Sequence, residues 1–218
     1  LRSALLTALG NAQLARGAGA EGLALMQRAE QNSLNALQPE TRMRALVGVA
    51  RALTHGGRLA QSNEYIAQAR QWALLHPQLP ERWLAQAMLL EGTNLHRLSR
   101  KEEALLVLEQ LTQHYEARGG FGSIAAIDAV VMHVYVLGEL NRRDEALTLS
   151  TRLHEQLRAN AKVPLAGRKA ILGAHAFALL GVKREAEAEQ AFRDALAADE
   201  AIYGVDHIRT MISLNNLA

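Results

Sequence analysis

One pattern of residues recurs along the whole chain at a nearly constant spacing, and it restricts the possible folds more than any other feature. Residues at i, i+4 and i+7 lie on the same face of an α-helix. A small residue followed by mostly apolar residues at these offsets occurs five times, at three steps of 42 residues and one step of 40. The five triads are Gly22/Met26/Ala29, Ser62/Ile66/Ala69, Ala104/Leu108/Leu111, Ala146/Ser150/Leu153 and Ala188/Phe192/Ala195.

The segment before each triad repeats with the same period. Two apolar columns recur every 42 residues, and turn-forming residues separate them from the triads. Each copy is therefore predicted to be a helix, a tight turn and a second helix. The columns are Leu46/Met88/Val130/Leu172 and Leu53/Leu95/Leu137/Leu179, and the turn residues are Gly17, Gly56, Gly57, Ser99, Asn141, Gly181 and Lys183.

Proline and glycine mark the boundaries between copies. All four prolines lie there, and the boundary without proline contains Gly119, Gly120 and Gly122. Both residue types disrupt helix interiors, so their positions support the same repeat. Ser99 with Glu102 is predicted to form a capping box, and Asn141 to cap the next helix.

Helix pairs at this period predict an all-α fold, a right-handed α-solenoid of helix-turn-helix repeats with a period of about 42 residues. Armadillo-type and HEAT-type solenoids have similar periods and stay open as alternatives. The chain begins at Leu1 and its last helix lacks a stop signal, so we expect a fragment of a longer protein. We predict one solenoid over residues 1–218, with repeats at about 1–38, 41–77, 83–118, 124–160 and 166–203 and a half repeat at 207–218.

Composition excludes several classes of protein. Apolar residues make up 49% of the chain, which is sufficient for a sizeable core, and there is no cysteine for a disulfide. The net charge of +2 arises from intermixed basic and acidic residues, so no broad field attracts nucleic acid or lipid. No apolar run is long enough for a membrane span. We expect a cytoplasmic protein that contacts neither nucleic acid nor membrane.

The final third resembles a known family most closely. In AEAEQAFRDALAADEAIYGVDHIRTMISLNNLA, residues 186–218, the Tyr203-Gly204 turn, Asp206-His207 and the LNNLA run at 214–218 are similar to the long repeat of kinesin light chains, a branch of the tetratricopeptide repeat (TPR) family. Residues 2–29 resemble TPR regions of bacterial multidomain regulators. Gln13, Glu91 and Ser150 depart from the pattern by placing polar residues in apolar columns.

Catalytic, cofactor and metal sites are not predicted. Gly17 to Gly22 spell GxGxxG, but a helical pattern precedes them, so a turn between helices is the better interpretation. The eight histidines have no metal-ligand spacing. His133 and His175 share one column and are interpreted as packed side chains rather than a pair facing across a groove. The mixed-charge segments 100–103, 142–145 and 183–187 are interpreted as solvated helix starts. We expect no enzyme and no cofactor.

The resemblance implies a concave groove lined by the first helix of each repeat. Amides there suit a peptide backbone because they both donate and accept hydrogen bonds, and arginines suit carboxylates. Val47, Leu89 and Phe177 are expected to form an apolar wall. The polar candidates for the peptide-binding groove are Asn11, Arg44, Arg51, His55, Gln86, Thr93, Arg97, Asp128, Tyr135, Asn215 and Asn216.

The predicted function is that of a protein-protein interaction scaffold. It would bind a peptide, a partner protein or another domain of the same chain in the groove. The alternative is a sensory or regulatory arm of a bacterial Ser/Thr kinase or transcriptional regulator whose output domain lies outside residues 1–218.

Overall fold

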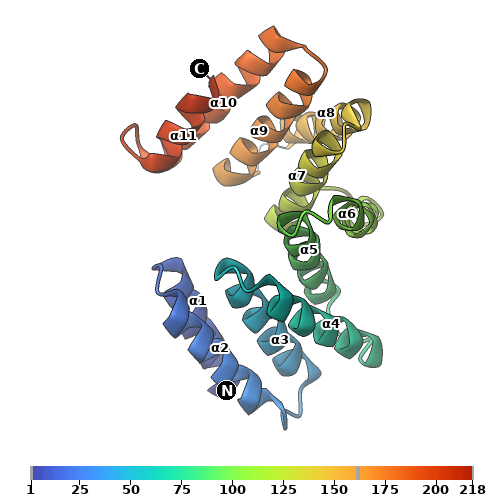
Figure 1. The fold of residues 1–218 in the computed structure, drawn as a ribbon, viewed down its shortest axis with the longest axis vertical. Coiled ribbons are helices and arrows are strands. Elements are labelled where there is room, and N and C mark those ends of the chain that lie inside the picture. The colour runs from blue at the N-terminus through green and yellow to red at the C-terminus, as the bar shows by residue number, and fades with distance from the viewer. Residues whose placement is uncertain (1, 161–162, 218) are drawn as a thin grey trace. The chain divides into compact units, whose positions relative to one another are not determined.

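The computed structural model describes residues 2–160 and 163–217. Within these ranges every regular element is an α-helix, and the helices follow one another with short connections (Figure 1). They are α1 (Arg2–Ala15), α2 (Gly19–Ser33), α3 (Pro39–His55), α4 (Leu59–Leu75), α5 (Arg82–Arg97), α6 (Lys101–Glu116), α7 (Ile124–Glu139), α8 (Arg143–Ala159), α9 (Leu165–Gly181), α10 (Glu185–Tyr203) and α11 (Ile208–Leu217).

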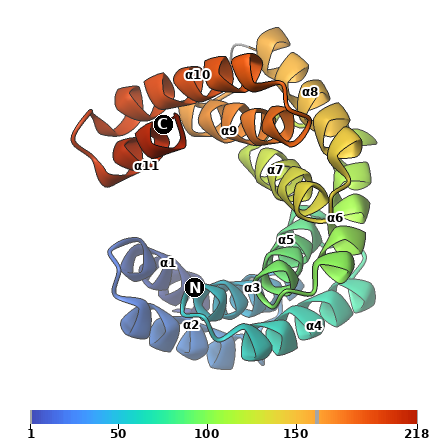
Figure 2. The same cartoon turned by 45° about the horizontal axis from the view of Figure 1, so that its top comes forward.

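The helices form two compact units. Unit 1 comprises residues 1–100 with α1 to α5, and unit 2 comprises residues 101–218 with α6 to α11. Within each unit a helix packs on the next one along the chain, and alternate helices also meet, as α3 does with α1 and α5 and α7 does with α9 (Figures 1 and 2). This is the stacking of helical hairpins that the period predicts. The boundary between the units lies inside the third predicted repeat, and one continuous solenoid over the whole chain stays a prediction.

The predicted triads and columns form the core. Every triad residue is buried, including the large side chains of Met26, Ile66 and Leu108, which are at most 2% exposed. The two apolar columns of the first helices are buried as well. A thin hairpin has too little interior to bury both helices by itself, so these residues are covered by neighbouring hairpins.

The hairpin turns share one backbone conformation. Gly17, Gly57, Ser99, Asn141 and Lys183 all have φ between 59° and 81°, in the left-handed region. After each of them the next amide donates to a carbonyl five residues earlier, as in the Arg142 N to Leu137 O bond of 2.9 Å. This is the Schellman arrangement at a helix C-terminus.

The predicted caps at Ser99 and Asn141 are therefore wrong. Both residues terminate the preceding helix, because each lies two residues before the first residue of the next helix. The N-cap of α8 is Arg142, whose guanidinium bonds Glu145 at 2.6 Å, and the N-cap of α10 is Arg184, which bonds Glu187 in the same way. These local ion pairs confirm the interpretation of the charged segments at 142–145 and 183–187 as solvated helix starts.

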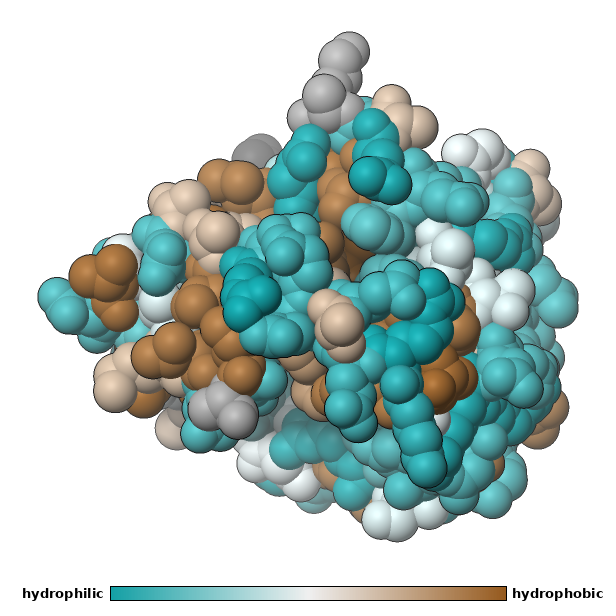
Figure 3. All heavy atoms as spheres, turned by 90° about the horizontal axis from the view of Figure 1, so that it is seen from above, coloured by the Kyte–Doolittle hydropathy of each residue, from teal (hydrophilic) through white to brown (hydrophobic). Residues whose placement is uncertain are grey.

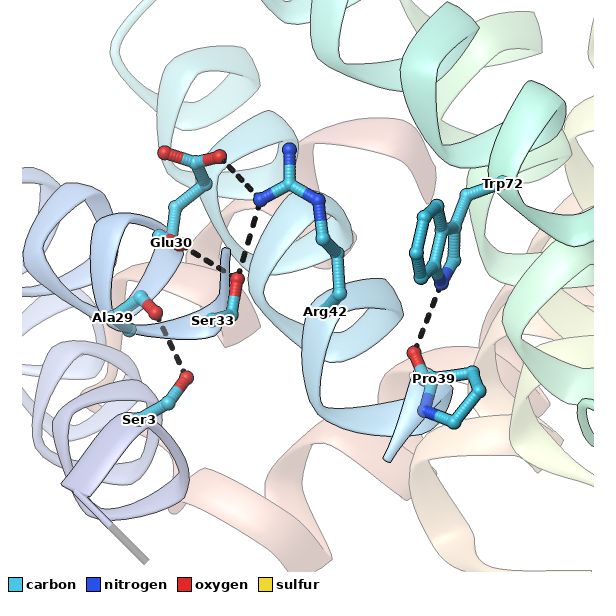
Figure 4. Close-up of polar contacts among 7 residues, drawn as sticks. All are labelled: Ser3, Ala29, Glu30, Ser33, Pro39, Arg42 and Trp72. Carbon is cyan, nitrogen blue, oxygen red and sulfur yellow. Dashed lines mark hydrogen bonds and ion pairs between the residues drawn. The ribbon is translucent and has the colours of Figure 1, made fainter. Parts of the chain in front are cut away.

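Polar contacts join helices both between hairpins and within a hairpin of unit 1 (Figure 4). Arg42 of α3 donates to Glu30 at 2.7 Å and to Ser33 at 3.4 Å, both on α2. Trp72 Nε1 of α4 donates to the carbonyl of Pro39, the first residue of α3, at 3.0 Å. Pro39, at a predicted repeat boundary, is thus the first residue of α3, and its carbonyl accepts a hydrogen bond from α4.

The surface is mixed in character. On the face drawn in Figure 3, hydrophobic residues reach the surface in patches between hydrophilic ones. Among the helices described, none combines the length and hydropathy required to cross a lipid bilayer.

Candidate peptide-binding surface

The first helices of unit 1 bring three predicted residues together where α3 meets α5. Arg51 Nη2 of α3 donates to Gln86 Oε1 of α5 at 3.1 Å. Arg97 Nη1, at the end of α5, donates to the main-chain carbonyl of Thr54 on α3 at 2.6 Å. Arg51, Gln86 and Arg97 therefore lie along one seam between two first helices, which we call the α3–α5 seam.

The electrostatics of this seam favour an anion. Arg51 is half-buried, and burial lowers its pKa, although a guanidinium remains charged at neutral pH. Arg51 and Arg97 bond neutral oxygens, and neither is paired with a carboxylate in the part of the chain that the structure describes. A partly buried charge without a counter-ion is costly, so a carboxylate or phosphate at this position would be stabilised.

Trp83, which the sequence analysis did not select, lies near the N-terminal end of α5, whereas Arg97 lies at its C-terminal end. Arg44 and Arg82 each place their guanidinium 5.6 Å from the Trp83 ring centroid. Glu40 accepts hydrogen bonds from Trp83 Nε1 at 3.0 Å and from Arg82 at 2.6 Å, and these bonds hold the pKa of its carboxyl below the ordinary value. Arg44 is therefore engaged within unit 1 and is less available to a ligand than Arg51.

The remaining predicted residues of unit 1 are placed separately. Asn11 on α1 and His55 at the end of α3 are exposed. The Thr93 hydroxyl donates to the carbonyl of Leu89 at 2.8 Å, so its proton is used within α5. Val47 does not belong to an exposed wall: it is 1% exposed and packs in the core, while Leu89 is half-buried.

In unit 2 the predicted residues lie around an aromatic row. Tyr135 of α7 packs edge-on against Phe177 of α9 with ring centroids 5.4 Å apart, and Phe177 packs in the same way on Phe192 of α10. Burial raises the pKa of Tyr135. Phe177 remains 44% exposed, as expected of a wall residue. Its ring thus offers an apolar contact surface beside the Tyr135 ring.

The other predicted residues of unit 2 are Asp128, Asn215 and Asn216. Asp128 lies on α7 and is exposed. The protein around it partly desolvates its carboxyl group, which raises the pKa of that group. Asn215 and Asn216 are exposed on α11. The described contacts do not join these asparagines to Asp128 or Tyr135.

The histidine column is packed, as the sequence indicates. His133 is buried and its Nδ1 lies 2.9 Å from the Thr112 hydroxyl. His175 bonds the Ser150 hydroxyl at 3.1 Å and lies against the His154 ring at 4.7 Å. Burial lowers the pKa of both His133 and His175 to about 4, so both are neutral at pH 7.

The GxGxxG segment is a turn between helices. Gly17 adopts φ of 81° after α1, and α2 begins at Gly19. A helix rather than a strand precedes it, which excludes the strand-turn-helix context of a dinucleotide fingerprint. Within the described ranges no three side chains of His, Asp or Glu are grouped as a metal site.

Comparison with known proteins identifies the fold. No protein-family model matches the sequence, and no curated protein matches it. Solved structures do match it. The TPR-like repeats of a kinesin light chain from Podosopora anserina superpose with a TM-score of 0.72 at 16% identity, over 93% of this chain and 98% of that one.

Two further proteins are also similar. BtubC (BKLC) from P. vanneervenii gives a TM-score of 0.75 at 13% identity, over 91% of this chain and 80% of that one. A thermophilic TPR protein of Thermus thermophilus gives 0.66 at 20% identity, over 98% and 99%. The fold is therefore an all-α, TPR-like solenoid of the kind found in kinesin light chain repeats, as the resemblance implies.

Proposed function

We propose that the chain is a non-enzymatic interaction scaffold whose first-helix face binds an extended segment of a protein. The bound segment belongs to a separate partner or to another domain of the same protein. The α3–α5 seam of unit 1 supplies the charge and amide groups for this binding. Within unit 2 the Phe177 row is a separate, apolar candidate surface. In repeat scaffolds the first helices form such surfaces because the second helices cover their other side.

The observation that supports this proposal best is the state of Arg51. Its charge is half-buried beside a neutral amide, and Arg97 lies on the same seam with a carbonyl for a partner. Charge without compensation in a folded protein is retained at a cost, which a ligand carboxylate would offset. The proposed partner segment is therefore acidic.

The test is a titration with labelled, capped peptides in which glutamate alternates with leucine, compared with peptides in which lysine replaces glutamate. We expect the acidic peptide alone to bind. In the Arg51→Glu, Arg97→Glu double variant its affinity should fall about 10- to 100-fold, since hydrogen bonds between charged groups contribute about 1.5–3 kcal/mol. Fluorescence anisotropy measures both affinities.

A matched control is Arg193→Glu, which reverses an exposed arginine that is ion-paired with Glu189 on the second helix α10. It should leave peptide affinity unchanged, and circular dichroism should show equal helix content in all variants. Equal binding of acidic and basic peptides, or no loss of affinity in the double variant, would contradict the proposal.

A second candidate function is that of a regulatory arm acting on an output domain outside residues 1–218. The similarity of residues 2–29 to TPR regions of bacterial regulators favours it. In that case the same face binds an acidic segment of the output domain, and a kinase or winged-helix sequence adjoining this chain is the observation that tests it.

A further inference from the structure

A buried carboxylate lies where the last helix of unit 2 is attached. Asp199 of α10 is 0% exposed. Its Oδ2 accepts a hydrogen bond from the Ser213 hydroxyl of α11 and lies 3.3 Å from Lys169 Nζ of α9. Its Oδ1 is also buried and has no hydrogen-bond partner among the residues that the structure describes. One side chain therefore joins three helices and is still not fully satisfied.

The preceding repeat has apolar residues at the positions equivalent to Asp199 and Ser213. Leu157 of α8 and Ile171 of α9 each come 42 residues before Asp199 and Ser213, and both are buried beside one small cavity. Equivalent positions thus hold Leu and Ile at the α8–α9 junction and Asp and Ser at the α10–α11 junction. An apolar pair needs no partner for stability, whereas a buried carboxylate does.

Other contacts also attach α11 to α10: Arg209 donates to the Tyr203 hydroxyl at 3.0 Å and places its guanidinium 5.3 Å from the Tyr203 ring centroid. Thr210 donates to the carbonyl of Gly204 at 2.7 Å, and Leu217 packs on a small cluster that includes Ala176 and Phe192. In the described chain α11 packs its backbone on α10 but not on α9, whereas α9 packs on both of the helices that precede it, α8 and α7. Among the polar contacts between α11 and the helices before it, the Ser213–Asp199 hydrogen bond is the buried one.

We propose that Lys169, Asp199 and Ser213 form an ionic latch that makes α11 a separately opening helix. The Lys169 ammonium compensates the buried charge of Asp199. The Ser213 hydroxyl bonds the same carboxylate and so attaches α11 to it. In the closed state α11 is packed and Oδ1 accepts no hydrogen bond from a described residue, so this state is less stable than an apolar junction would be. When α11 opens, water can hydrate the carboxylate. Local opening of this kind leaves the rest of a domain folded.

The latch has a consequence for binding that rests on the proposed function. Asn215 and Asn216 lie on α11, so they belong to the first-helix face only while the latch is closed. Asp199 is in this sense a positioning residue, which acts through α11 and does not itself touch a ligand.

The test is hydrogen exchange of the full chain, followed by mass spectrometry of peptides from each helix and without any ligand. In Lys169→Met, the buried carboxylate loses its cation, and protection of residues 208–217 should fall about 100-fold while that of α7 is unchanged. In the double variant Asp199→Leu, Ser213→Ile, which copies the preceding junction, protection of residues 208–217 should exceed that of the native chain.

Unchanged protection of α11 in Lys169→Met would overturn the latch, and so would an equal loss over α7, α9 and α11, which is the result of a purely structural role. If the double variant does not fold, Asp199→Asn replaces it. Asparagine keeps an acceptor for Ser213 without charge, so Lys169→Met should then have no further effect on α11. A persistent effect overturns the latch. Since no peptide is used, this result is independent of the peptide titration.

Discussion

At the scale of single residues, the polar side chains of one column are each matched by a partner on the preceding helix. Glu91, His133 and His175 succeed one another at steps of 42 residues in α5, α7 and α9. Glu91 pairs with Arg70, and the two histidines bond Thr112 and Ser150. A polar group inside a helix stack is tolerated when it is hydrogen-bonded, so these departures from the pattern do not disturb the fold.

The neutral, buried state of His133 predicts a loss of stability in acid. Its pKa is about 4 in the folded chain and about 6.5 in an unfolded one. As pH falls from 6.5 to 4, the unfolded chain binds a proton that the folded chain does not, so the free energy of unfolding decreases by up to about 3 kcal/mol. His133→Gln should reduce this dependence on pH, as measured by urea unfolding between pH 7 and 4.5.

The control for this prediction is His55→Gln, because His55 is exposed at the end of α3. It should leave the dependence of stability on pH as it is in the native chain. A native slope that persists in His133→Gln would show that the imidazole does not cause the loss of stability in acid.

At the scale of elements, the five hairpin turns require the same left-handed residue but do not all have the residue that suits it. Gly17 and Gly57 adopt this conformation without strain, while Ser99 and Lys183 carry a Cβ that disfavours it. Asparagine, as at Asn141, is intermediate. The sequence pattern places the turns, but it does not show which residue of each turn is left-handed, since Ser and Asn are also good N-caps.

Lys183→Gly should therefore stabilise unit 2 by about 1 kcal/mol. The reciprocal change, Gly57→Ala, should destabilise unit 1 by a similar amount, and it isolates the backbone effect because a Cβ at that position would contact nothing within 4 Å. Thermal unfolding measures both changes. Stabilisation by Gly57→Ala would show that entropy of the unfolded chain outweighs the strain.

At the scale of the whole molecule, the fold follows from periodicity, whereas the candidate surface follows only in part. Helix pairs, turns and core columns are local in sequence, and one rule of i, i+4 and i+7 spacing finds them. The α3–α5 seam depends on pairs such as Arg51 with Gln86, which lie 35 residues apart, and no spacing rule selects them. The same is true of Asp199, whose burial becomes visible only when α9, α10 and α11 are assembled.

The division into two units adds one limit to sequence reasoning. The period runs through residues 100 and 101 without interruption, yet the compact units separate there. One continuous solenoid over residues 1–218 therefore stays a prediction.

The positions of the two tryptophans, one of which is the Trp83 between Arg44 and Arg82, have a practical consequence. Both tryptophans of the chain, Trp72 and Trp83, lie in unit 1, so indole fluorescence observes that unit alone. The histidines whose pKa burial lowers, at 133, 154 and 175, all lie in unit 2. On acidification the urea midpoint from circular dichroism should therefore fall below the midpoint from tryptophan emission. Midpoints that move together from pH 7 to 5 would instead reveal that the two units melt as a single cooperative body.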